Sequence, residues 1–504
     1  MGKKTPEASN EENINAEFKK DRIKTQVLTN AANIIDNADG QMLSALYTPI
    51  QSTLGFSLTK LGAITTARAL LQSVSTPVWG WFSDKFSRKF ILSLGCFIWG
   101  IFTVTLGFLS NFWGLLFIRA LTGLGLAVIV PTAQSLIADY FHESKRGKAF
   151  GMLGLTGVLG AVFGTLYATI IGEYSLFGFE GWRIAFISVG GLSILLGVFV
   201  VLFGKDPIRG SSESEIKNLV DKKTEERYSI QIADIKKIIT NKTFVLIVFQ
   251  GVMGLIPWNS IMFVIYWFEH IGFQSGLAGI AFAVIAIGAA LGNLFGGFLG
   301  DKAAEWKPDK GRILVAQISV FSGIPMMFVI FLAIPREATT LSLVLFILVG
   351  FFTGFLISWC APAANNPIFS ELFEPEIRST AFAIDRLFEG SVAATGTLIV
   401  ALLAEYAFGY TPFPQGGSPM DLPNPVRLAN IDAIAYALII ATCVPWFLCF
   451  IIYTFAYFTY PDDRKRIKEI IKARKTELLA LSDLDDQEET FKEKAKEKQR
   501  EEEY

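Results

Sequence analysis

The 504-residue chain is 52% hydrophobic and 18% charged, and its mean hydropathy of +0.44 is too high for a soluble globular protein of this length. The formal net charge of −1 says nothing about nucleic acid, but the sequence shows no basic, aromatic-rich surface pattern that would bind it. The two histidines and four cysteines show no metal-ligand spacing, so we expect no metal, no cofactor and no enzyme activity.

Twelve segments are long and apolar enough to cross a membrane as helices, since one span takes about 20 mostly apolar residues. In chain order they are roughly 26–53, 59–82, 90–109, 112–138, 147–172, 183–204, 243–269, 276–300, 313–334, 340–369, 380–404 and 432–460. The first is interrupted by Asp36, Asn37 and Asp39. The polar first 25 residues show no cleavable signal peptide.

Basic residues predict the orientation of these spans. Lys and Arg are concentrated in the terminal regions and in alternate loops, which places both termini in the cytosol. The predicted organisation is a cytosolic N-terminal tail (1–25), a six-helix half (26–204), a cytosolic linker (205–242), a second six-helix half (243–460) and a charged cytosolic C-terminal tail (461–504).

A short pattern of small, acidic and basic residues occurs once in each half. Gly80-Trp-Phe-Ser-Asp84-Lys85 returns as Gly297-Phe-Leu-Gly-Asp301-Lys302. Further along, Asp139 followed by Arg146 returns as Glu371 followed by Arg378. Two matches in the same order indicate a duplicated membrane unit, and secondary transporters are built from such repeats around a site near the membrane midplane.

The first copy, continued by Ser87, Arg88 and Lys89, resembles the loop 2–3 signature of the major facilitator superfamily, with Ser87 in place of a second glycine. The run Arg119-Ala-Leu-Thr-Gly123-Leu-Gly125 is similar to that superfamily's helix-4 motif. The resemblance covers about 26–460. It implies an all-α integral membrane protein with twelve transmembrane helices in two six-helix halves, the major facilitator fold.

The resemblance also implies a conformational latch, which holds the halves together on the cytosolic side when the carrier faces outward. The residues assigned to it are Gly80, Asp84, Lys85, Arg88, Lys89, Asp139, Arg146, Asp301 and Arg378. Gly80 would allow a second helix to approach closely, and Asp84 can accept from amides at a helix N-terminus. The alternative is that the basic residues only anchor the loop at the lipid boundary.

Charged side chains inside the spans are scarce, because each costs about 2.5–3.5 kcal/mol at a helix centre. They are Asp36, Asp39, Arg68 and Arg119 in the first half, and Asp385, Arg386 and Glu389 in the second. As in several carriers of the superfamily, Asp39 and Arg119 would couple proton binding to substrate binding; a static ion pair is the alternative. Asp385 and Glu389 share a helix face, so Glu389 is a second candidate proton site, whereas Asp385 and Arg386 suit a salt bridge.

Aromatic and amide side chains near helix-breaking prolines predict the substrate cavity. These residues are Trp258, Asn259, Trp359, Asn365 and Asn366. Prolines in such spans free backbone carbonyls and allow bending. Tyr266 and Trp267, near an outer helix end, are interpreted as aromatics of the membrane interface.

The runs Lys205-Asp-Pro-Ile-Arg-Gly210 and Leu136-Ile-Ala-Asp139 are most similar to the spinster-like branch of lipid carriers, although Leu126 stands where that branch often has Glu. The resemblance implies a proton-coupled transporter of lysolipids working by alternating access. A small organic anion or other polar solute is the alternative substrate, and a non-transporting receptor on the same fold is the alternative class. Expected partners are the substrate, protons and membrane lipids, with a monomer in the plasma membrane or a lysosome- or vacuole-like membrane.

Overall fold

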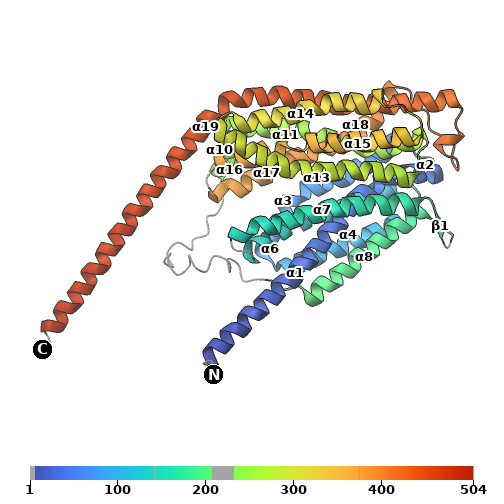
Figure 1. Ribbon diagram of the computed structural model, residues 1–504. Coiled ribbons are helices and arrows are strands. Elements are labelled where there is room, and N and C mark those ends of the chain that lie inside the picture. Colours follow the sequence, from blue (N-terminus) through green and yellow to red (C-terminus); the bar gives the residue numbers. More distant parts are fainter. Residues whose placement is uncertain (1–5, 141–142, 177, 207–231, 374, 503–504) are drawn as a thin grey trace, which may run out of the picture.

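The computed structural model describes residues 6–140, 143–176, 178–206, 232–373 and 375–502, and it is almost entirely helical (Figure 1). The N-terminal half contains α1 (Pro6–Ala45), α2 (Tyr47–Leu54), α3 (Leu58–Lys85), α4 (Arg88–Leu106), α5 (Phe112–Leu126), α6 (Ile129–Tyr140), α7 (Glu143–Gly172), β1 (Ser175–Leu176), β2 (Phe179–Glu180) and α8 (Gly181–Phe203). The two short strands pair in antiparallel fashion and connect α7 to α8.

The C-terminal half repeats the helical arrangement with more interruptions. It contains α10 (Ile232–Ile239), α11 (Lys242–Ser260), η3 (Ile261–Phe263), α12 (Val264–Ile271), α13 (Ser275–Trp306), α14 (Gly311–Phe328), η4 (Val329–Ala333), α15 (Thr340–Ile357), η5 (Ala361–Asn365), α16 (Asn366–Leu372), α17 (Pro375–Ala393), α18 (Gly396–Leu402), η6 (Leu403–Ala407), η7 (Pro419–Asp421) and α19 (Asn424–Glu502). The π-helical turn η5 contains Pro362, which cannot donate the backbone hydrogen bond of a regular helix.

Ten helices in the described part of the chain are long and apolar enough to cross a membrane. They correspond to the third to twelfth predicted spans. The first two predicted segments also form helices, α1 with α2 and then α3, but they are not among the ten because they carry charged and polar side chains. The twelve-span count therefore stays a prediction, as do the domain boundaries.

Glycines set the close packing of α7 against α1. A Cβ at Gly160 would lie 2.2 Å from the Ile34 backbone oxygen, and one at Gly164 would lie 2.3 Å from Ala38 Cα. Small residues thus bring the two backbones together, as they do at many membrane helix interfaces. At Gly80 no atom of the described residues lies within 4 Å of such a Cβ, so the expected close approach is not found among them.

The two halves meet at the end of the bundle opposite the chain termini, called the outer end below (Figure 1). Every hydrogen bond between described residues that joins the halves lies toward this end. Those bonds link Thr48 to Glu269, Gln51 to Tyr266, Ser52 to Gly416, Thr53 to Gln415, Thr59 to Glu405, Gly62 to Thr397, Thr66 to Ala394 and Thr397, and Glu173 to Ser275. The structure is therefore closed at the outer end.

Tyr266 and Trp267 belong to this closed region and are fully buried. The indole of Trp267 donates to the Ile431 carbonyl at 3.0 Å, and the Tyr266 hydroxyl bonds to Gln51 and Tyr410. The interpretation of these two rings as interfacial aromatics was wrong, because their position near a helix end does not reveal that another helix covers them.

Candidate functional site

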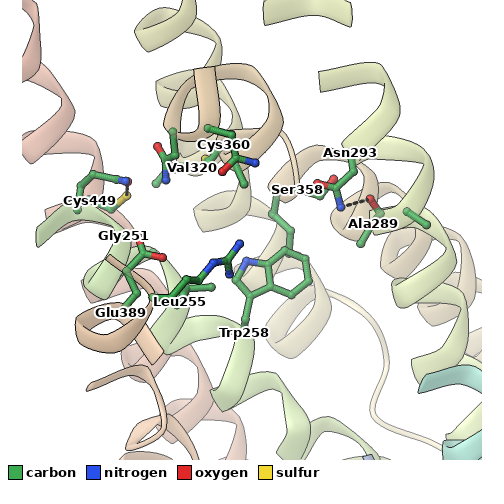
Figure 2. Close-up of a pocket in the computed structure, with 18 of the residues that line it drawn as sticks. Gly251, Leu255, Trp258, Ala289, Asn293, Val320, Ser358, Cys360, Glu389 and Cys449 are labelled. Atoms are coloured by element: carbon green, nitrogen blue, oxygen red, sulfur yellow. Dashed lines mark hydrogen bonds between the residues drawn. The ribbon is translucent and has the colours of Figure 1, made fainter. Parts of the chain in front are cut away.

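A cavity of about 380 Å³ lies between the halves, on the side of the outer hydrogen bonds that faces the chain termini (Figure 2). The N-terminal half supplies a short stretch of its wall, from Asn37, Gly157, Val158 and Ala161. The C-terminal half supplies the rest, from α11, α13, α14, α15, η5, α16, α17 and α19. Its volume is within the usual range for small-molecule sites, about 300–1,000 Å³.

The cavity wall has a polar part and an apolar part. The polar part consists of Gln250, Asn293, Ser358, Asn365, Asn366, Asp385, Arg386 and Glu389. The apolar part includes Leu255, Trp258, Ala289 and Val320, which Figure 2 shows around the same space. Such a wall can hold a molecule that carries both a polar group and an apolar body.

Two carboxyl groups lie side by side on α17. Asp385 and Glu389 are one helical turn apart, 4% and 6% exposed, and their carboxyl groups are within hydrogen-bonding reach of one another. One oxygen of each has no hydrogen-bond partner. The Glu389 carboxyl fills the space beside Gly251, where a Cβ would lie 1.5 Å from Glu389 Oε1. Two such groups repel when both are ionised but can share one proton.

Arg386 is exposed beside this pair and lines the cavity, and it makes no ion pair with another described residue. The predicted salt bridge between Asp385 and Arg386 is therefore not formed in this structure. Adjacent residues on a helix point in different directions, which separates the two side chains. A guanidinium left free in a cavity is suited to bind an anionic group.

The four charged side chains inside the predicted spans of the N-terminal half form a compact cluster. Arg119 Nη1 lies 2.9 Å from Asp39 Oδ1, and Arg68 Nε lies 3.0 Å from Asp39 Oδ2. Arg119 also donates to the Asp39 carbonyl at 3.0 Å. Asp36 is held less closely, at 3.5 Å from Arg68 Nη2 and 3.5 Å from Gln72 Nε2. Two acids thus balance two bases.

This cluster lies outside the cavity wall. Asp39 and Arg119 are 0% and 1% exposed, and neither Asp36 nor Arg68 lines the cavity. With both oxygens of Asp39 occupied, the arrangement matches the static ion pair between helices more closely than a site open to substrate.

The predicted cavity residues divide into two groups. Trp258, Asn365 and Asn366 line the cavity. Asn259 does not line it, since its amide donates along α11 to the Leu255 carbonyl at 3.4 Å. Trp359 does not line it either, and its ring packs against Phe295 and Phe355.

The predicted latch is described only in part. The side chains of Asp84, Asp139, Arg146 and Arg378 lie outside the described residues. The Lys85 amine lies 4.0 Å from the centre of the Trp81 ring, and Arg88 is buried. The Lys89 amide donates to Asp206 of the same half, as does the Ser87 hydroxyl, while Asp301 pairs with Arg312 at 2.9 Å. These described contacts stay within one half.

Several cavity residues were not predicted from the sequence. Gln250, Asn293 and Ser358 look like isolated polar residues in apolar helices, and Gly251 looks like a packing glycine. Cys360 and Cys449 also line the cavity. Intramembrane amides were a usable signal, because uncharged polar groups are also costly in lipid.

Comparisons with known proteins agree with this fold. Residues 30–367 match the Major Facilitator Superfamily. Protein spinster of Drosophila melanogaster is 26% identical over 214 residues, 42% of this chain and 33% of that protein. The sphingosine-1-phosphate transporter SPNS2 of Danio rerio is 25% identical over 215 residues, 42% of this chain and 41% of that protein. The multidrug resistance protein MdtG of Escherichia fergusonii is 27% identical over 268 residues, 53% of this chain and 62% of that protein. The matches span less than two thirds of each relative's length.

Solved structures extend the similarity to the whole bundle. A bacterial homolog to the human lysosomal transporter spinster, in an inward-facing and unoccupied conformation, has a TM-score of 0.74 at 19% identity, covering 88% of this chain and 98% of that one. The nucleoside transporter NupG has a TM-score of 0.61 at 15% identity, covering 85% of this chain and 99% of that one. At these identities the similarity establishes the fold.

Proposed function

The chain belongs to the major facilitator superfamily, and from this premise we propose that it is a secondary active transporter that works by alternating access and couples transport to protons. The observation that carries the proposal is the cavity between the halves, with a carboxyl pair and a free guanidinium on its wall. The family and the ten apolar helices make the chain a multi-pass membrane protein. An enzyme activity has no support, because the chain matches the Major Facilitator Superfamily and is similar to the sphingosine-1-phosphate transporter SPNS2.

Alternating access requires the hydrogen bonds at the outer end to break while the halves close on the cytosolic side. The bonds described at the outer end are suited to this, because they are individually modest, about 0.5–1.5 kcal/mol each. The latch residues of the two loop repeats are proposed to form the opposing contact when the cytosolic side closes. In this cycle the protein alternates between a state closed at the outer end and a state closed on the cytosolic side, and the same cavity is used in both.

Proton coupling is assigned to Asp385 and Glu389. A substrate anion bound at Arg386 brings negative charge next to this pair, and a nearby like charge favours protonation of a carboxyl group. By reciprocity, a proton on the pair strengthens binding of the anion. The substrate anion and the proton therefore bind and move together, which predicts symport of an anionic substrate with a proton.

The substrate we propose is an amphiphile with an anionic head group, such as a lysolipid. Arg386 and the amides of Asn365 and Asn366 would bind the head group, and Trp258 with the alanines of α13 would contact the apolar part. The similarity to the sphingosine-1-phosphate transporter SPNS2 of Danio rerio supports this assignment. A smaller organic anion is the second candidate, and the modest cavity volume of about 380 Å³ favours it.

A binding and flux screen tests the function. Purified protein would be tested for thermal stabilisation by lysophospholipids, sphingoid phosphates, organic anions and sugars, and each stabilising compound would be followed for uptake into liposomes under an imposed pH gradient. Gradient-driven uptake of an anionic amphiphile is expected. Uptake of only small anions would select the second candidate, and binding without flux under any gradient would identify a receptor.

A native cysteine gives a direct test of where the substrate binds. Cys360 lines the cavity and is partly exposed, whereas Cys443 does not line it. A stabilising compound should slow modification of Cys360 by a small thiol reagent by about tenfold at saturating concentration, as mass spectrometry of the labelled peptide would show. Unchanged labelling of Cys360, with Cys443 as the reference, would place the substrate elsewhere.

Gly251 is predicted to be essential for the position of Glu389. In Gly251→Ala the added Cβ would overlap the Glu389 carboxyl, which must leave its place. We expect pH-gradient-driven uptake to fall at least tenfold. Gly254→Ala is the matched control, since its Cβ would meet only Cys449 Sγ at an ordinary 3.5 Å. Equal uptake by the two variants would show that the Glu389 position is unimportant.

A further inference from the structure

The closed outer end contains two carboxyl groups that bridge the halves without a base. Glu269, at the end of α12, is 6% exposed; its Oε2 accepts from the Thr48 hydroxyl of the other half, and its Oε1 has no partner. Glu405 in η6 is partly exposed; its Oε2 accepts from Thr59 of the other half, and its Oε1 has no partner. Within the described part of the chain, neither forms an ion pair.

The charged groups around Glu269 do not compensate it. Glu173, from the end of α7, adds a like charge and accepts from the Ser275 amide at 3.0 Å. Arg427 of α19 donates to the His270 and Ile271 carbonyls and does not pair with the carboxyl. The imidazole of His270 bonds to the Tyr266 carbonyl at 2.9 Å and to the Tyr410 hydroxyl at 3.2 Å, also away from Glu269.

The surroundings of Glu405 are similar. The nearby Lys60 amine lies over the Phe56 and Phe112 rings, 5.6 and 5.7 Å from their centres, and makes no ion pair with Glu405. The other titratable groups that face Glu405 are the hydroxyls of Tyr266 and Tyr410, which bond to one another. Both carboxyl groups therefore accept hydrogen bonds from neutral hydroxyl groups.

An ionised carboxylate buried without a base costs far more free energy than a neutral carboxyl group. A neutral group still accepts from threonine through its carbonyl oxygen, so closure does not require the charge. We propose that Glu269 is a second proton-binding site, distinct from the cavity pair, and that the outer end closes when Glu269 is protonated. Opening the outer end separates Glu269 from Thr48, exposes it to water and releases its proton to the outer solution.

Proton binding and closure are then linked. Because the closed form holds one more proton, lowering the pH should shift the equilibrium toward closure, by up to about tenfold per pH unit. An acidic outer compartment would therefore favour the conformation seen here. This linkage does not depend on the substrate or on the carboxyl pair of the cavity.

The test measures the distance between the halves at the outer end as a function of pH. Spin labels introduced as unnatural amino acids at Leu176 and Glu337, both exposed on outer loops of opposite halves, keep the four native cysteines in place. Electron–electron distance measurements on the full chain in lipid nanodiscs, between pH 4.5 and 8.5, should show the closed population rising as the pH falls.

The variants separate this proposal from other causes. Glu269→Gln mimics the protonated group, so it should keep the outer end closed and remove the pH dependence of closure. Thr48→Val should favour the open form at every pH. Glu180→Gln is the control, since Glu180 pairs with Arg183 in its own half. A Glu269→Gln variant that opens at all pH values, or that keeps the full pH dependence, would overturn the proposal. No flux is measured, so this result is independent of the transport assignment.

Discussion

Glu389→Gln is expected to abolish proton-driven accumulation while substrate binding stays within a few-fold of the native value. Glutamine keeps the shape of the side chain beside Gly251 but cannot take up or release a proton. The loss of accumulation should be at least a hundredfold, measured as the steady-state concentration ratio of substrate across liposomes with an imposed pH gradient.

Glu389→Asp is the matched variant, because it keeps a titratable group on the same face of α17. It should retain part of the accumulation and a pH-dependent rate, whereas the glutamine variant should exchange substrate at a rate nearly independent of pH. If Glu389→Gln accumulates substrate as the native protein does, the carboxyl pair takes no part in proton coupling. Loss of binding in both variants would instead make Glu389 a substrate contact.

Asp39→Asn is expected to destabilise the protein by about 3–5 kcal/mol, because it leaves two neighbouring guanidinium groups with only Asp36 to balance them. Arg119→Gln should cost a similar amount. The double variant should be less destabilised than the sum of the two, since it restores one acid and one base. Thermal unfolding in detergent, with reversible denaturation where it can be reached, measures these differences.

The surface pair of Glu180 and Arg183 provides the reference for this experiment. Glu180→Gln should change stability by less than about 1 kcal/mol, because that carboxylate is 42% exposed. Additive losses at Asp39 and Arg119 would show that the two do not act as a pair. If Asp39→Asn has normal stability but its transport no longer depends on pH, Asp39 takes part in proton coupling.

The fold was predictable because membrane helices are specified by composition. Long apolar segments, alternating basic loops and a repeated Gly-to-Asp pattern are local properties of the sequence, and they lead to the superfamily that residues 30–367 match. The charged residues inside the spans were also visible, since burial in lipid makes each of them exceptional.

The site was predictable only in part, because packing decides which buried charges reach the cavity. Asp39 and Arg119 look like the coupling pair in the sequence, yet the structure closes them onto each other away from the cavity. Trp359 and Trp258 are equivalent as sequence signals, but only Trp258 of α11 lines the cavity, whereas the Trp359 ring packs against Phe295 and Phe355. Glu269 gave no signal, because its threonine partner lies more than two hundred residues away.

The most direct test of proton-coupled transport is simultaneous recording of substrate and proton movement in liposomes containing the full chain. With no membrane potential, addition of a stabilising substrate should drive protons in the same direction as the substrate, detected by a pH-sensitive dye inside the vesicles, and Glu389→Gln should move substrate alone. Substrate movement by the native protein without any proton movement, or movement in opposite directions, would contradict the account.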